Sequence, residues 1–254
     1  MKHTYLSVLL LASFAACGDK SDADYKAEVV AAMHDSISVD LEALVQASID
    51  LQTAAPTHAW NATNDANAIT MMQAAWKRTR VAYEHVEGAT APIFADLDGS
   101  MDERYDAYLS DLGAVGDQEL FDDKGVTGMH GIERILYSAT IRPEVITFES
   151  PLPGYKAAAY PKTDGEAMSF KTVLVQKLID DAKSLRDQWQ PAAIDIGAAY
   201  QGLVGLMNEQ KEKVNKAATG EEESRYARTT LFDLRNNLDG TDRKSTRLNS
   251  SHSS

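Results

Sequence analysis

Apolar residues recur every third or fourth position along most of the chain, and this spacing places them on one face of an α-helix. Residues 25–53 carry such side chains at Val29, Val30, Met33, Ile37, Leu41, Leu44, Val45 and Ile49. Residues 65–88 carry a seam at Met72, Trp76, Thr79, Tyr83 and Val86, with steps of four and three positions. Such steps are typical of helical bundles. No segment alternates convincingly between apolar and polar residues, so the pattern predicts an all-α protein.

The same spacing predicts further helices at residues 102–112, 127–138, 167–189, 194–217 and about 220–238. The predicted connections are residues 54–63, 89–101 and 141–163, the last of which contains four prolines. A long connection inside a compact domain often carries function. We therefore expect an all-α helical bundle, built as one domain with at least one element truncated.

The first 17 residues have the pattern of a bacterial export signal. Their apolar stretch is too short to span a bilayer, and small residues then precede Cys17. This order resembles the lipobox of bacterial lipoproteins, in which the cysteine becomes the lipidated N-terminus, although Phe14 stands where that pattern prefers leucine. The alternative is an ordinary signal peptide cut near Ala16, with Cys17 as a free thiol. Both interpretations export the protein across the inner membrane.

The other end of the chain, residues 242–254, has no apolar period and no helix caps. Residues 242–252 match the translation of a common sequencing-library adapter. We therefore expect a non-native tail, so that residues 18–241 form the natural helical domain and its C-terminal part is missing.

The charge and the cysteine content of the chain exclude some classes of partner and metal site. The chain has 38 acidic and 25 basic residues, a formal net charge of -13. Binding to a phosphate backbone needs clustered Lys and Arg, so nucleic acid is a poor candidate partner. The single cysteine rules out an intrachain disulfide and a cysteine-based zinc site.

One helix carries a pattern with chemical meaning. On a helical wheel, His130 and Glu133, three positions apart, project from one face beside the apolar stripe of residues 125–137. Gly128 and Gly131 add no bulk, so another backbone or a ligand can approach. An imidazole and a carboxylate on one face can hold a metal ion together. A His–Glu surface pair beside a packing tyrosine explains the same spacing without a metal.

A second helix carries the carboxylates Glu84 and Glu87 at the edge of its apolar seam. An inward-leaning carboxylate is costly unless it is paired or coordinated, and facing helices with two ligands each are typical of metal sites in bundles. In those metal sites, however, the ligands follow the order Glu-x-x-His, whereas this chain has His-x-x-Glu at residues 130–133. Arg80 offers the alternative, because it can pair with Glu87 and leave no need for a metal.

Other carboxylates are weaker candidates for metal ligands. Asp96, Asp98 and Asp102 have a spacing that suits a hard cation, but they lack the pattern of a twelve-residue calcium loop. We interpret residues 221–223, three consecutive glutamates, as the favourable acidic start of the last helix.

The segment Gly128-Met129-His130-Gly131-Ile132-Glu133 resembles the G-x-H-x-x-E motif of the imelysin-like family. Together with residues 84–87, 208–218, 222–226 and 233–238, it is most similar to the branch of EfeO/EfeM-type periplasmic iron-uptake proteins. The resemblance covers about residues 24–241. It implies two packed helical bundles, of which the second is incomplete here. It also implies that His130 and Glu133 bind the metal, with Glu87 and Glu84 as companions.

The resemblance further implies a non-enzymatic lipoprotein, anchored to a membrane through Cys17 in the periplasm or cell envelope. Such a protein would bind iron, ferric or ferrous, and pass it to an inner-membrane permease of the Efe type. Zinc and copper are alternative metals. The alternative function is a metallopeptidase, because imelysin-like proteins are classed with peptidases. A zinc peptidase favours H-E-x-x-H, whereas this chain has Gly131 and Arg134 at the corresponding positions.

Overall fold

The computed structural model describes residues 20–250, without the side chains of residue 114 and residues 243–250. The predicted export signal and the lipidation residue Cys17 lie outside the described residues. In the described part every regular element is a helix, which confirms the all-α prediction. None of the helices there is both long enough and apolar enough to cross a bilayer.

The elements follow the chain in this order: α1 Asp22–Ala54, α2 Ala66–Thr90, α3 Ala95–Asp102, α4 Tyr105–Leu112, α5 Gly128–Leu136, α6 Pro143–Glu149, α7 Asp164–Ser169, α8 Val175–Trp189, α9 Ile196–Lys216 and α10 Thr230–Ser250. Two short 3₁₀ turns, Gly113–Val115 and Ser138–Thr140, follow α4 and α5. A π-helical turn, Phe170–Leu174, joins α7 to α8.

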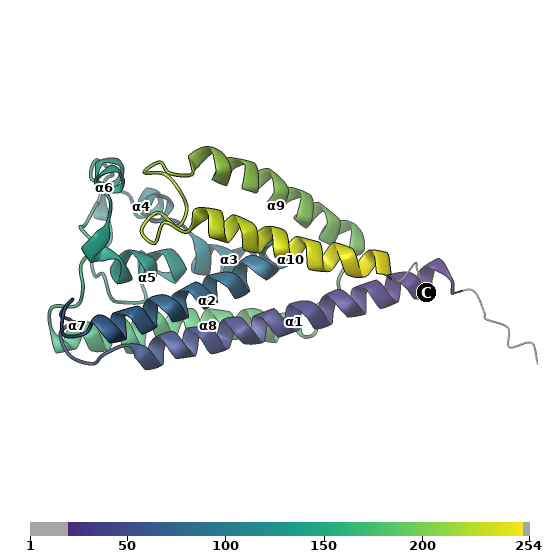
Figure 1. The fold of residues 1–254 in the computed structure, drawn as a ribbon, viewed down its shortest axis with the longest axis horizontal. Helices are drawn as coiled ribbons and strands as arrows, with labels where there is room; N and C mark the ends of the chain where they lie inside the picture. Colours follow the sequence, from purple (N-terminus) through teal and green to yellow (C-terminus); the bar gives the residue numbers. More distant parts are fainter. Residues whose placement is uncertain (1–19, 251–254) are drawn as a thin grey trace, which may run out of the picture.

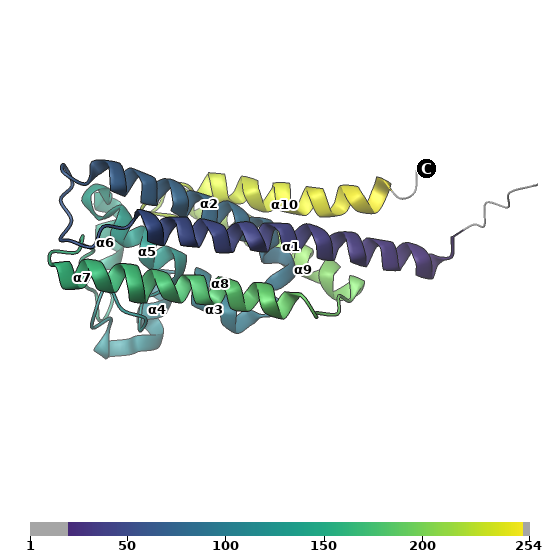
Figure 2. The same cartoon turned by 90° about the horizontal axis from the view of Figure 1, so that it is seen from below.

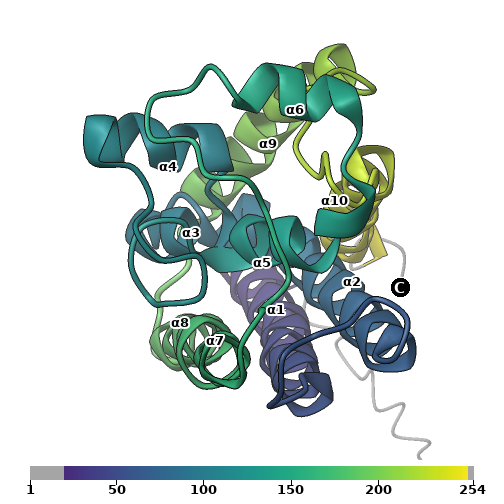
Figure 3. The ribbon, with the colours of Figure 1, turned by 90° about the vertical axis from the view of Figure 1, so that its left-hand side faces the viewer.

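The core lies between α1, α2 and α8, which run along the length of the molecule (Figures 1 and 2). Their predicted apolar stripes face one another, and Leu44, Trp76 and Leu178 have no exposed surface. The Trp76 indole N–H donates to the carbonyl of Met129 at 2.9 Å, so the short helix α5 is attached to α2. Seen from the end, α5 lies between α8 and α10 (Figure 3).

Helices α9 and α10 pack on the other side of α2 (Figure 1). The closest approach of α9 to α2 is at Gly202, where a Cβ would collide with the carbonyl oxygen of Gly88. Two small residues therefore let the two helices touch. As a result, polar residues of α9 and α10 meet the carboxylates of α2 inside the protein rather than in solvent.

The structure corrects three predicted boundaries. Residues 95–101, expected in a connection because of their Asp and Gly content, form α3 together with Asp102, which was expected to begin the next helix. The long connection after α5 contains α6, which starts at Pro143. The last helix begins at Thr230, not near residue 220. Residues 217–229 form turns that pack on α5 and α6 instead. Glu222 accepts from Arg142 at the start of α6, and the Ala227 amide donates to Glu133 of α5.

Candidate metal centre

The three consecutive residues Gly128, Met129 and His130 bring two helices together at the site. Gly128 has a φ of +68°, and a Cβ on it would lie 2.5 Å from the carbonyl oxygen of Met101. Only glycine accepts both conditions without strain. The start of α5 therefore rests against the last turn of α3, and His130 lies next to Asp102, the final residue of α3.

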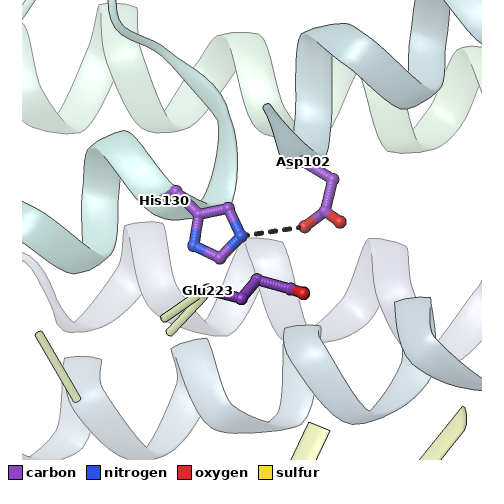
Figure 4. A group of neighbouring side chains, drawn as sticks. All are labelled: Asp102, His130 and Glu223. Atoms are coloured by element: carbon purple, nitrogen blue, oxygen red, sulfur yellow. Dashed lines mark ion pairs between the residues drawn. The ribbon is translucent and has the colours of Figure 1, made fainter. Parts of the chain in front are cut away.

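His130 is held by Glu133 on one side and faces Asp102 on the other. Its Nδ1 lies 2.9 Å from Glu133 Oε2, while the other Glu133 oxygen accepts from the backbone amides of Tyr226 and Ala227 at 3.0 and 2.8 Å. The imidazole Nε2 is buried, has no hydrogen-bond partner in the described part of the chain, and lies 3.4 Å from Asp102 Oδ1 (Figure 4). A carboxylate behind the imidazole is the arrangement that orients a metal-ligating histidine.

Two sets of side chains among the described residues have ligand atoms within 4.8 Å of one another. The first is Asp102, His130 and Glu223, and the second is Glu84, Glu223 and Asp233. The second set already holds a cation, the guanidinium of Arg80. Arg80 donates to Glu84 and Asp102 and, at 2.7 Å, to Glu223. Arg80 thus also reaches two members of the first set, Asp102 and Glu223. The first set differs in its imidazole, because His130 Nε2 is a ligand atom that accepts no hydrogen bond from Arg80 and can coordinate a metal ion, so this set is the better candidate (Figure 4).

Negative charge exceeds positive charge in this interior. With every group ionised, six carboxylates, those of Glu84, Glu87, Asp102, Glu133, Glu223 and Asp233, would meet three cationic groups, those of Arg80, Lys213 and His130, an excess of three negative charges. Buried charges without partners are costly. A bound cation would lower that cost.

When no metal ion is bound, protonation of some of these carboxylates reduces the excess negative charge. Burial raises the pKa of Glu84 to about 8 and that of Asp233 to about 6. Burial alone would lower the pKa of His130, but the carboxylates of Asp102 and Glu133 raise it to about 9. Burial would likewise raise the pKa of Asp102, yet Arg80 and His130 hold it well below its usual range. A metal ion at His130 Nε2 would therefore replace a proton.

A cavity of about 250 Å³ leads to the first set from the surface. Asp102, Glu223 and Lys213 line both the cavity and the interior cluster. The remaining wall consists of Glu103, Arg104, Ala107, Glu209, Glu212 and Lys216. An ion can thus reach the carboxylates of Asp102 and Glu223 without passing through the apolar core.

The structure gathers the four metal residues that the sequence suggested, but gives them different surroundings. His130 Nε2 and Glu84 Oε2 are buried and have no hydrogen bond to any of the described residues, and they contact Asp102 and Lys213 through ion pairs only. Glu133 lies behind His130, with both oxygens engaged. Glu87 accepts from the Asn237 amide at 2.8 Å. The proposed pair of Arg80 with Glu87 does not form, and Arg80 pairs with Glu84 instead.

Three other residues of this cluster carry only weak signals in the sequence. Asp102 was one of several aspartates in a supposed loop, and Glu223 was interpreted as part of a helix start. Lys213 stood out only as a member of the family-like segment 208–218. The signal that could identify such residues is the resemblance of segments 208–218, 222–226 and 233–238 to one family. These segments contain Lys213, Glu223 and Asp233.

Packed helices that bring carboxylates and an imidazole together inside the protein are the architecture in which helical bundles build metal sites. Comparison with known proteins identifies the family. The sequence model of the imelysin peptidase family matches residues 30–244, so the chain belongs to the imelysin family.

Curated relatives include the iron uptake system component EfeM of Pseudomonas syringae, 27% identical over 162 residues, or 64% of this chain and 43% of the relative. The iron uptake system component EfeO of Yersinia pseudotuberculosis is 28% identical over 190 residues, 74% of this chain and 40% of the relative. EfeO of Escherichia coli is 28% identical over 190 residues, 75% and 40%. The chain thus spans less than half the length of these relatives.

Proposed function

We propose that this protein binds iron as a component of an iron-uptake system, through Asp102, His130 and Glu223. The observation that carries the proposal is the buried Nε2 of His130, which lies 3.4 Å from Asp102 Oδ1 and has no hydrogen bond within the described part of the chain, in an interior where carboxylates outnumber cationic groups. The names of the relatives support iron as the cargo.

The donor set suits a hard or borderline cation. Two carboxylates and one imidazole are ligands that iron accepts readily, whereas soft Cu(I) favours thiolates and thioethers. Three protein ligands leave coordination positions for water or a chelator, and the cavity beside Asp102 and Glu223 opens a path for exchange. Such a site fits a cargo ion that must be released again. In this arrangement Glu133 holds the imidazole of His130, and Glu84 and Glu87 contribute to the negative field.

We further propose that the protein works in the periplasm, anchored through a lipid on Cys17, and that it passes iron to an inner-membrane permease. The lipobox-like sequence before Cys17 supports the anchor. The names of the relatives as components of an uptake system support a partner that takes over the ion.

Calorimetry on the purified protein tests the metal site. Fe(III) as a soluble chelate, Fe(II), Zn(II) and Cu(II) are titrated into the wild type and into His130→Ala. His58→Ala is the matched control, because His58 is exposed and pairs with Asp65 at 2.9 Å, outside the site. We expect saturable iron binding in the wild type and the control, and its loss in His130→Ala. Equal binding by all three proteins would refute the assignment.

The metallopeptidase alternative is tested on the same preparations. Cleavage of an unstructured protein substrate is measured with and without a chelator. A zinc peptidase of the H-E-x-x-H kind uses two imidazoles, and His130 is the only one in the described cluster around Asp102 and Glu223. Chelator-sensitive cleavage that His130→Ala abolishes would replace the transport role with an enzymatic one.

A further inference from the structure

Residues 217–229 join α9 to α10 at the end of the molecule where α4, α5 and α6 are gathered (Figure 1). This segment reaches the candidate metal centre at two points. Its Glu223 is a member of the first set of ligands. Its backbone amides at Tyr226 and Ala227 donate to Glu133, which in turn holds the imidazole of the centre. The position of the segment therefore affects one ligand and the group that orients another.

The backbone of the 217–229 segment does not hold itself in place. The segment consists of turns. Near its two ends, Ala218 and Arg228 have positive φ angles of 65° and 60°. Residues other than glycine adopt such angles at a cost, and they persist where the surrounding structure compensates. Contacts with neighbouring elements must therefore fix this segment.

Contacts with α6, and with the residue before it, fix the segment from outside. Arg142, which precedes α6, donates to Glu222. Gly220 lies so close to α6 that a Cβ on it would be 2.7 Å from a backbone carbonyl oxygen of that helix. Glu149, the last residue of α6, accepts a hydrogen bond from the phenol of Tyr226. The short helix α6 therefore supports the segment that carries a candidate ligand.

Glu149 belongs to a buried charge network beside the metal centre. Its side chain is only 2% exposed. Arg134 Nε lies 3.3 Å from Glu149 Oε2, and Arg225 Nη1 lies 3.8 Å from Glu149 Oε1. Arg225 also donates to Asp106 of α4 at 2.6 Å. Two guanidinium groups thus face two carboxylates, so this network is balanced in charge and needs no metal ion.

Tyr226 connects Glu149 to the metal centre. Its hydroxyl donates to Glu149 of α6, while its backbone amide donates to Glu133 of α5. The residue is buried, and both acceptors are carboxylates, which form stronger hydrogen bonds than neutral groups. A change at the phenol is therefore passed on to the amide, and from the amide to Glu133.

We propose that Glu149 is a positioning residue of the metal centre, which holds the 217–229 segment through Tyr226 so that Glu223 and the two amides reach the centre. The inference rests on the proposed function. Glu149 acts through this segment and not on the metal ion itself. Its place in the long connection of residues 141–163 gives that connection a role in the site.

The test removes a single hydroxyl group. The full chain, Tyr226→Phe and Tyr105→Phe are titrated in a calorimeter with Fe(II) without oxygen and with Fe(III) as its citrate chelate. Phenylalanine keeps the ring and the backbone amide of residue 226 but cannot donate to Glu149. We expect Tyr226→Phe to weaken iron binding about 10–100-fold, as the loss of an outer partner of a metal ligand typically does.

Tyr105→Phe is the matched control. Tyr105 is also buried and packs on Arg134, but its hydroxyl bonds to the backbone of Lys156 and not to the 217–229 segment. The control loses a buried hydroxyl beside the same network and should bind iron as the wild type does. An equal loss of affinity in both variants would reduce Glu149 and Tyr226 to general contributors to stability and overturn the proposal.

Hydrogen exchange in the iron-free proteins gives a second measurement, which a general loss of stability does not reproduce. The amides of Tyr226 and Ala227 should exchange about tenfold faster or more in Tyr226→Phe, because opening of the segment no longer breaks the phenol contact. In Tyr105→Phe these two amides should exchange as in the wild type, even if the core of α1, α2 and α8 exchanges faster. Unchanged exchange of both amides in Tyr226→Phe would also overturn the proposal.

Glu149→Gln tests the other end of the contact. Glutamine keeps the length of the side chain but removes the charge that faces Arg134 and Arg225. Iron binding should weaken, and the effects of Glu149→Gln and Tyr226→Phe should not add, because both variants break the same connection. Additive losses would show that the two residues act separately, which contradicts the proposal.

The outcomes separate this inference from the proposed function. Iron binding that is equal in the wild type and Tyr226→Phe would overturn the positioning role and leave the metal site intact. Absence of iron binding in the wild type, with faster exchange of the two amides only in Tyr226→Phe, would refute the proposed function. It would still support the hold of Glu149 on the 217–229 segment.

Discussion

Replacing Gly128 by alanine should separate α5 from α3 and damage the metal centre without touching a ligand. Gly128 has a φ of +68°, and its missing Cβ would lie 2.5 Å from Met101 O and 2.7 Å from Ser100 O. A left-handed backbone costs a non-glycine residue about 1–2 kcal/mol. The added methyl meets backbone that cannot rotate away, which costs about 1–3 kcal/mol more.

The expected loss for Gly128→Ala is therefore about 3 kcal/mol of unfolding free energy. In a chain of this size that loss corresponds to a fall in the unfolding midpoint of about 6–12 °C. Moving α5 away from α3 should lengthen the distance between His130 Nε2 and Asp102 Oδ1, which is 3.4 Å in the structure. Iron affinity should therefore fall with stability. Thermal unfolding followed by circular dichroism and iron calorimetry measure the two effects.

Gly99→Ala is the matched control. Gly99 lies in α3 near the same interface, but among the described residues no atom from outside its own helical turn comes within 4 Å of the position that its Cβ would take. Alanine there should stabilise the helix by about 0.5–1 kcal/mol and leave iron binding unchanged. If Gly128→Ala unfolds at the same temperature as the wild type, glycine is not what brings α5 against α3, and this account of the motif fails.

Three further predictions concern the charges of the centre. Glu133→Gln should weaken iron binding about 10–100-fold in calorimetry, because it loosens the group that orients His130, yet leave the fold intact. Arg80→Met should lower the unfolding free energy by about 3–5 kcal/mol in urea titrations, since it leaves buried carboxylates without their guanidinium; a change below about 1 kcal/mol would contradict this. The iron-free protein should lose stability as pH rises from about 6.5 to 9. His130, whose folded pKa of about 9 exceeds its ordinary 6.5, contributes on the order of 3 kcal/mol below that range and loses it as the proton leaves. Saturating iron should flatten this pH dependence, and equal slopes with and without iron would argue against metal at His130.

Much of the fold was predictable because helices depend on short separations. The apolar stripes of α1, α2 and α8 are set by positions three and four apart, and they pack in the structure as the pattern predicted. The helix at residues 95–101 is not evident from the sequence because Asp and Gly lower helix propensity, but packing of this segment against α5 and α8 outweighs that preference. For residues 220–229 the sequence predicts helix, whereas the structure forms turns. Their glutamates suit a helix start, but Glu222 pairs with Arg142 and Glu223 with Arg80.

By itself, the sequence determined that the chain is helical, and that His130 and Glu133 share one face of one helix, because three residues along a helix are always neighbours. Only the tertiary structure decided which carboxylates surround them. Asp102, Glu223 and Lys213 are brought to α2 by the contact of Gly128 with α3 and by the packing of α9 over Gly88. Contacts between distant segments depend on how whole helices pack. A local pattern can therefore identify the histidine, but not the charges that determine what it binds.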